Sequence, residues 1–112
     1  MTTADRTAAE TRLREEHGSG QRDAALAARA MYPLDEETQP GGAFAKEATR
    51  RARDFGNEVA ALRGNEVGVA AERAIEALLD LARNHREMHY VAVFEDALEY
   101  ADGPVAAPES GE

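Results

Sequence analysis

The sequence of 112 residues contains no cysteine and no tryptophan, and Lys46 is its single lysine. The absence of cysteine excludes disulfide bonds and thiolate metal sites. No apolar run approaches the length that is needed to cross a membrane, and the N-terminus lacks the basic and apolar segments of a secretion signal. The sequence therefore predicts a soluble, cytoplasmic protein without a membrane partner.

Large apolar side chains are also scarce, because 24 of the 48 apolar residues are alanine. Full burial of a Leu, Ile, Val or Phe side chain contributes roughly 1.5–3 kcal/mol, whereas an alanine contributes little. The length allows one domain at most. The small number of large apolar side chains predicts that the chain completes its core against a second copy, as a homo-oligomer, or against a protein partner.

The charge is strongly unbalanced, with 22 acidic residues against 13 basic ones and a formal net charge of −9. Repulsion from phosphates opposes association of such a chain with nucleic acid, which excludes a general nucleic-acid coat protein. A local basic site for RNA stays compatible with this composition.

The periodicity of apolar residues predicts an all-α fold, either a helical hairpin or a small helical bundle that forms oligomers. Pro33 ends one helix, and Gly64-Asn65 makes a turn between two others. The predicted elements are a flexible N-terminal arm (1–20), a helical domain (21–102) with helices near 21–32, 43–63 and 66–101, and a disordered tail (103–112).

The last predicted helix changes its apolar face partway along. Its first half carries a stripe that includes Ile75 and Leu78, and its second half carries Val91, Phe94 and Leu98 on the opposite side. The favoured explanation is a break near 84–88, although no Gly or Pro stands there. An unbroken helix about 55 Å long that packs on another subunit is the second explanation, and a β-strand over Tyr90–Phe94 is the third.

These stripes predict the function. We expect an accessory, regulatory or assembly protein that acts by self-association or by binding a protein partner, and is not an enzyme. The segment 43–63 is the most regularly amphipathic part of the chain. The predicted interaction residues are Phe44, Phe55, Val59 and Leu62 with Ile75 and Leu78, and the second stripe Val91, Phe94 and Leu98.

The segment 83–90 (RNHREMHY) suggests an alternative, because it resembles the motif of the HEPN ribonuclease superfamily. These proteins are all-helical bundles in which an arginine, usually followed by a polar residue, precedes a histidine by a few positions. The resemblance covers eight residues of 112. It implies a dimer that cleaves RNA without metal, in which Arg83 stabilises the phosphate, His89 takes part in proton transfer and Asn84 orients.

A metal site is a further alternative. His85 and His89 stand four residues apart, and on a continuous helix Asp96 and Glu99 extend the same face, which suits Zn or Fe. The chain has no Glu-x-x-His motif of the ferritin-like type and no glycine-rich phosphate loop, so no cofactor is predicted. The favoured explanation of the same four residues is a solvated patch or the rim of a partner-facing surface.

Overall fold

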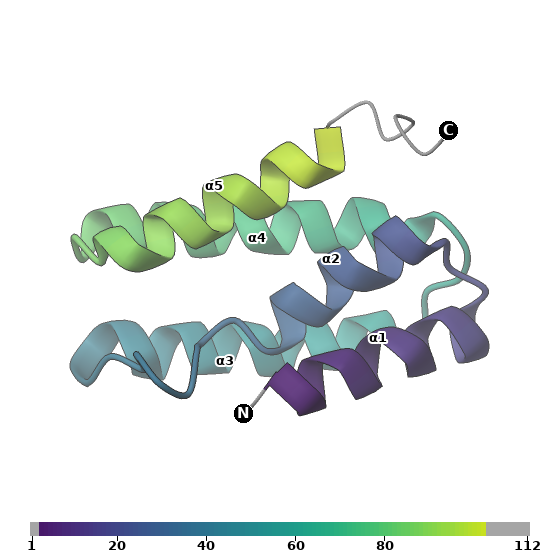
Figure 1. Ribbon diagram of the computed structural model, residues 1–112, viewed down its shortest axis with the longest axis horizontal. Coiled ribbons are helices and arrows are strands. Elements are labelled where there is room, and N and C mark those ends of the chain that lie inside the picture. Colours follow the sequence, from purple (N-terminus) through teal and green to yellow (C-terminus); the bar gives the residue numbers. More distant parts are fainter. Residues whose placement is uncertain (1–2, 103–112) are drawn as a thin grey trace.

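The computed structural model describes residues 3–102, and all regular structure in this range is helical. Figure 1 shows the five helices: α1 (Thr3–His17), α2 (Gln21–Met31), α3 (Gly42–Val59), α4 (Glu66–Asn84) and α5 (Met88–Asp102). The predicted all-α class is therefore confirmed. None of these helices combines the length and the apolar character that a membrane span needs. The predicted disordered tail lies outside the described residues.

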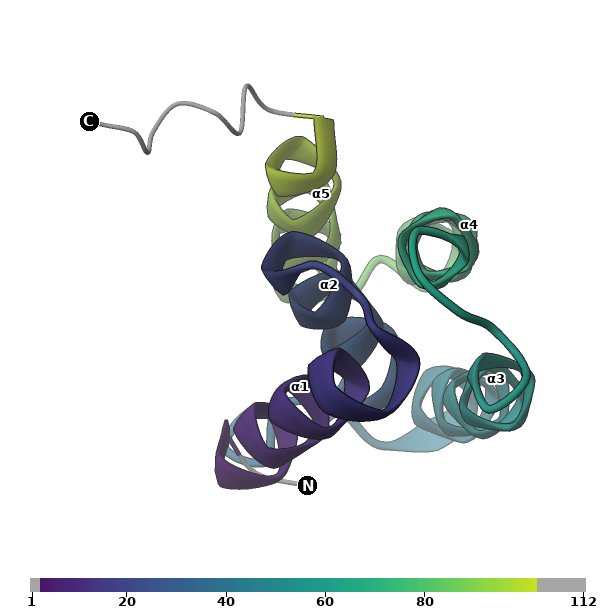
Figure 2. The same ribbon diagram turned by 90° about the vertical axis from the view of Figure 1, so that its right-hand side faces the viewer.

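The helices form two layers, with α1, α2 and α5 in one and α3 and α4 in the other (Figure 2). Helix α2 is the central element, since it packs against all four other helices. Small side chains make this possible, because Ala24, Ala27 and Ala30 are fully buried and let neighbouring backbones approach closely. At Gly68 of α4 there is no room for a side chain, since an added Cβ would lie 2.3 Å from the Oδ1 oxygen of Asp23 on α2.

The N-terminal segment is a packed helix, which corrects the predicted flexible arm over 1–20. Ala9 and Leu13 lie one turn apart on α1 and are 2% and 1% exposed. The end of α1 is tied to the α3–α4 connection, because the Gly64 N–H donates to the His17 carbonyl at 2.9 Å. Leu13, the large apolar residue of this helix, enters the core shared with α2.

The α4–α5 corner confirms the predicted break near 84–88 and excludes the unbroken helix. Arg86 adopts a left-handed backbone conformation with φ +57°. Its N–H donates to the Arg83 carbonyl at 3.1 Å, and the Glu87 N–H donates to the Ala82 carbonyl at 2.9 Å. This pair of bonds is a Schellman motif, in which glycine usually holds the left-handed position. With arginine there instead, the sequence carried no conventional stop signal.

The predicted strand over Tyr90–Phe94 is wrong, since these residues lie in α5. Tyr90 and Phe94 are both 1% exposed, and their one-turn spacing places them on the same helical face. The Tyr90 hydroxyl accepts the Asp35 N–H at 3.1 Å and donates to the Thr38 carbonyl at 3.1 Å. It thereby fastens the loop between α2 and α3 to α5.

Candidate functional site

The predicted interaction stripes form the core of this single chain. Both stripes turn inward because the corner at Arg86 folds α5 back beside α4. In this conformation most of the predicted interaction residues are closed to a partner. Seven of the nine residues are at most 7% exposed, namely Phe44, Phe55, Val59, Ile75, Leu78, Val91 and Phe94, while Leu62 and Leu98 are half-buried.

The three residues of the HEPN-like motif lie around the α4–α5 corner, and all three are exposed. Arg83 pairs with Glu95 at 3.0 Å and approaches Asp80 at 3.9 Å. Asn84 is the last residue of α4. His89 stands in the first turn of α5 with its ring edge-on to Tyr90 at a centroid distance of 4.8 Å. The guanidinium that would contact a phosphate is thus shared between two carboxylates of its own chain.

The break at the α4–α5 corner separates His85 from the other three proposed metal ligands, which all lie on α5. His85 caps the end of α4, whereas His89 belongs to α5, so the break removes the spacing on which the prediction depended. The His85 ring lies beside Phe44 at a centroid distance of 5.9 Å, and Asp96 and Glu99 are exposed on α5. Within residues 3–102, no group of three histidines or carboxylates is arranged to hold a metal ion.

A groove between α3 and α4 is the surface feature that best suits a binding site, and we call it the α3–α4 groove. It has a volume of about 610 Å³. Ala43 and Leu81 give it apolar lining, and His85 closes the end next to the α4–α5 corner. Its full lining is Ala43, Lys46, Glu47, Arg50, Arg53, Leu81 and His85.

The basic residues of the groove stand on α3 at positions 46, 50 and 53, a spacing that aligns side chains along one face of a helix. Helix α3 carries four basic and three acidic residues, whereas the rest of the chain carries nine basic and nineteen acidic ones. Positive charge is therefore concentrated on this helix although the chain as a whole is acidic.

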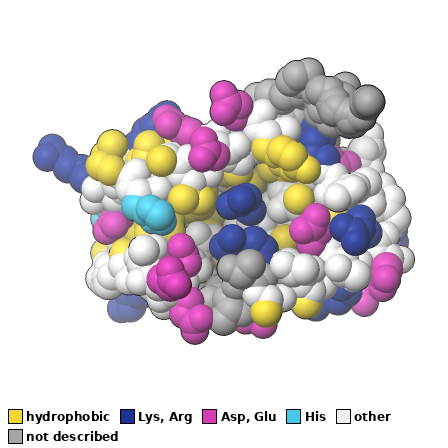
Figure 3. All heavy atoms as spheres, viewed as in Figure 1, with side chains coloured by type: hydrophobic (Ala, Val, Ile, Leu, Met, Phe, Trp, Pro, Cys, Tyr) yellow, Lys and Arg dark blue, Asp and Glu magenta, His cyan; other side chains and the backbone are white. Residues whose placement is uncertain are grey.

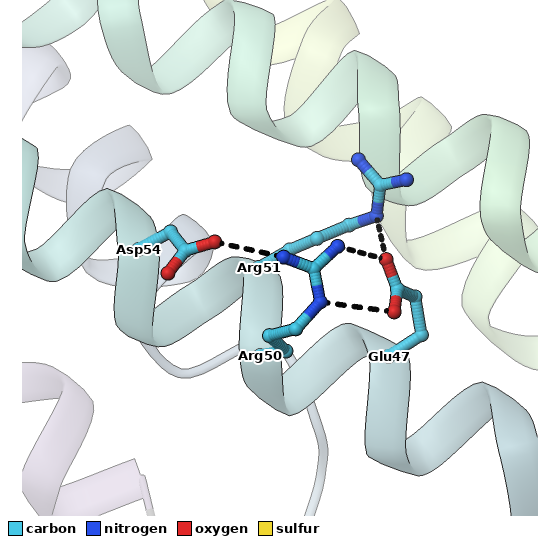
Figure 4. Close-up of polar contacts among 4 residues, drawn as sticks. All are labelled: Glu47, Arg50, Arg51 and Asp54. Carbon is cyan, nitrogen blue, oxygen red and sulfur yellow. Dashed lines mark hydrogen bonds and ion pairs between the residues drawn. The ribbon is translucent and has the colours of Figure 1, made fainter.

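An ion-pair network holds the middle of the groove in a defined geometry (Figure 4). Arg50 donates through two nitrogens to the two carboxylate oxygens of Glu47, and its third nitrogen donates to Asp54 at 3.1 Å. The Nε of Arg51 lies 3.1 Å from the same Glu47 carboxylate. Hydrogen bonding from Arg50 holds the pKa of Glu47 below its ordinary value and raises the pKa of Arg50. Glu47 stays ionised, and Arg50 is oriented along α3.

Two cations of the groove remain available to a ligand. Lys46 and Arg53 are exposed, and no carboxylate of the described chain lies within ion-pair distance of either. They flank the neutralised Arg50. A second hollow of about 270 Å³ lies further along the same two helices. Arg50 is in both linings, and Ala74 and Ala77 of α4 line the second hollow above the buried Phe55 and Leu78.

The opposite face, formed by α1, α2 and α5, is less organised. Figure 3 shows acidic, basic and hydrophobic side chains intermixed there. Its basic residue Arg6 serves the fold, because Nη2 donates to the Tyr32 carbonyl at 2.9 Å and links α1 to the end of α2. Burial, and then the charge of Arg29, lower the pKa of Arg6.

Of the groove residues, the sequence had pointed only to His85, and it did so as a metal ligand. The amphipathic pattern of the segment 43–63 places Arg50, Arg51 and Arg53 on the polar side of the helix. A usable signal was the gathering of four of the thirteen basic residues, including the single lysine, within positions 46–53 of an acidic chain. The apolar contribution of α4 could not be found in this way, because Leu81 belongs to a different segment.

Comparisons of the chain with protein-family models, with curated proteins and with solved structures gave no match. The resemblance of residues 83–90 to the HEPN motif therefore stays a prediction.

Proposed function

We propose that this protein is a non-enzymatic helical binding module that acts by contact with a protein partner, and that the α3–α4 groove is the contact surface. The observation that carries the proposal is the groove itself, which combines apolar lining with two free cations, Lys46 and Arg53, on an acidic chain. Sites that bind ligands are typically concave and largely apolar, with a few placed polar groups.

The burial pattern supports this assignment of the surface. The large apolar side chains already pack inside one chain, so no open core has to be completed by a partner. Three large hydrophobic residues of the described chain are exposed, Val69, Met88 and Tyr100, at 50–66%. They lie on separate turns of α4 and α5 and do not line either hollow of the α3–α4 seam.

Charge reversal tests the proposal. We expect tagged wild-type protein to capture a partner from its native host, and Lys46→Glu to lose that partner. Arg73→Glu is the matched control, because Arg73 is exposed on α4, makes the same change in charge and does not line the groove. Equal capture by the two variants would show that the groove is not the contact surface.

Oligomeric mass measured by light scattering, with and without Lys46→Glu, addresses self-association. A dimer that dissociates on this substitution would identify a second copy as the partner. A dimer that is unchanged would place self-association on another face.

Metal-independent RNA cleavage is a second candidate, favoured by the exposure of Arg83, Asn84 and His89 at one corner. If it is correct, purified protein should cleave single-stranded RNA in EDTA. Arg83→Ala or His89→Ala should abolish cleavage and leave the circular-dichroism spectrum unchanged. Cleavage that survives both substitutions would come from another source.

A further inference from the structure

The chemistry of the α3–α4 groove indicates what it binds, and this inference rests on the proposed function. We infer that the groove takes a short acidic segment of a partner protein that also presents an apolar side chain. The segment's carboxylates would pair with Lys46 and Arg53, and its apolar side chain would lie against Ala43 and Leu81.

The two cations are placed for a peptide. Positions 46 and 53 are seven residues apart on α3, which corresponds to roughly 10 Å along the helix axis. Carboxylates two turns apart on a partner helix, or about three residues apart on an extended strand, span that distance. Arg50 between them is already neutralised by Glu47 and Asp54. It therefore acts as a fixed spacer, and the free positive charge sits at its two sides.

The apolar lining supplies the second half of the recognition. Leu81 is half-buried at the groove, Ala43 is exposed at the start of α3, and the His85 ring lies tilted beside the buried Phe44 ring. An apolar side chain that enters here leaves water and contributes affinity that salt does not screen, because it is not an attraction between charges. Charge on the rim then mainly sets the choice of partner and the association rate.

Charge also argues against nucleic acid as the occupant. The Glu47 carboxylate lines the groove and is held ionised by its two arginines. A polyphosphate would meet this carboxylate and the repulsion of a chain with net charge −9. A short acidic segment carries few charges, and its apolar side chain gives it a contact that a phosphate backbone lacks.

The test is fluorescence anisotropy with a labelled peptide in which leucines recur every three or four positions among glutamates. Three probes accompany it: the same peptide with lysine for glutamate, the same peptide with serine for leucine, and oligouridine RNA. We expect the acidic leucine peptide to bind most tightly. Because exposed ion pairs contribute roughly 0.2–1 kcal/mol each, the double variant Lys46→Glu, Arg53→Glu should weaken binding about tenfold, which corresponds to about 1.4 kcal/mol.

Two further variants keep the test independent of folding. Ala43→Glu should also weaken binding, because it adds a carboxylate at the groove, and an acidic residue in the first turn of α3 is favourable for the helix. Arg73→Glu should change affinity less than about twofold. Circular dichroism of each variant confirms that it is folded.

Specific outcomes overturn the inference. Equal binding of the serine peptide would show that no apolar contact contributes. If RNA bound more tightly than the peptide and the groove variants weakened that binding, the occupant would be a nucleic acid. Failure of the acidic peptide to bind, while Lys46→Glu still abolishes capture of the host partner, would refute the acidic occupant and leave the binding-module proposal standing. Failure of both would refute both.

Discussion

The hydroxyl group of Tyr90 offers the sharpest test of how this fold is held together. Substitution of Tyr90 by Phe removes one oxygen atom and preserves the ring contacts with Phe44 and Phe94 at centroid distances of 5.6 and 6.1 Å. The lost oxygen is the partner of the Asp35 N–H and the Thr38 carbonyl, each at 3.1 Å. The experiment therefore isolates the link between α5 and the α2–α3 loop.

The size of the effect follows from these two backbone bonds. A hydrogen bond contributes about 0.5–1.5 kcal/mol net, so the substitution should reduce the free energy of unfolding by about 1–3 kcal/mol. For a chain of this length that lowers the melting temperature by roughly 4–12 °C. Water can reach the loop and replace part of the loss, which places the expectation toward the lower end.

Thermal and urea unfolding followed by circular dichroism measure this change, and hydrogen exchange of the Asp35 amide reports the loop directly. Tyr100→Phe is the matched control, because Tyr100 lies on the same helix and is 50% exposed. It should change the free energy of unfolding by less than about 0.5 kcal/mol. If Tyr90→Phe unfolds at the same temperature as the control, the loop is held by other contacts and the reasoning fails.

Three further predictions concern packing, the corner and pH. Gly68→Ala should lack the gain of up to about 1 kcal/mol that Gly56→Ala gives in urea unfolding, because the new Cβ at position 68 overlaps the Asp23 carboxylate, which has to rotate away. Recovery of the gain in the presence of Asp23→Ala would verify the cause, and an equal gain from both glycine substitutions would contradict it. Arg86→Gly should raise the free energy of unfolding by up to about 1 kcal/mol, since glycine adopts the left-handed conformation without strain. A lower melting temperature would show that Arg86 is not strained at the α4–α5 corner. Wild type should be more stable than Glu47→Gln at neutral pH. This difference should disappear as the pH falls from 4.5, the ordinary pKa of a glutamate side chain, through the lowered pKa of Glu47. A difference that persists at low pH would show that the ion pairs contribute nothing to it.

The proposed function differs from the sequence prediction in the surface that it uses. The stripes that predicted a partner are occupied within the chain, because α5 returns along α4 and brings Phe94 into the same core as Phe44. Although the chain has few large apolar side chains, its alanines allow α2 to lie close to its neighbours, and this effect is separate from the small area that each alanine buries. Binding of a partner is thus proposed from the groove and no longer from an unfinished core.

The sequence by itself determined the helices of the central domain. Apolar residues recur every three or four positions from Phe44 to Val59 and from Ala71 to Ala82, which is the local geometry of a helix. The observed bounds of α2 to α5 therefore lie within a few residues of the predicted ones. The turn at Gly64 was visible for the same reason, since its φ of +58° favours glycine.

Only the tertiary structure decided the rest. The docking of α1 depends on contacts between Leu13 and residues distant in the sequence, and the corner at Arg86 places arginine where the usual signal is glycine. The groove exists because Lys46 and Arg53 on α3 lie beside Leu81 on α4. Periodicity describes how one segment is arranged about its own axis, and it contains no information on which two segments become neighbours.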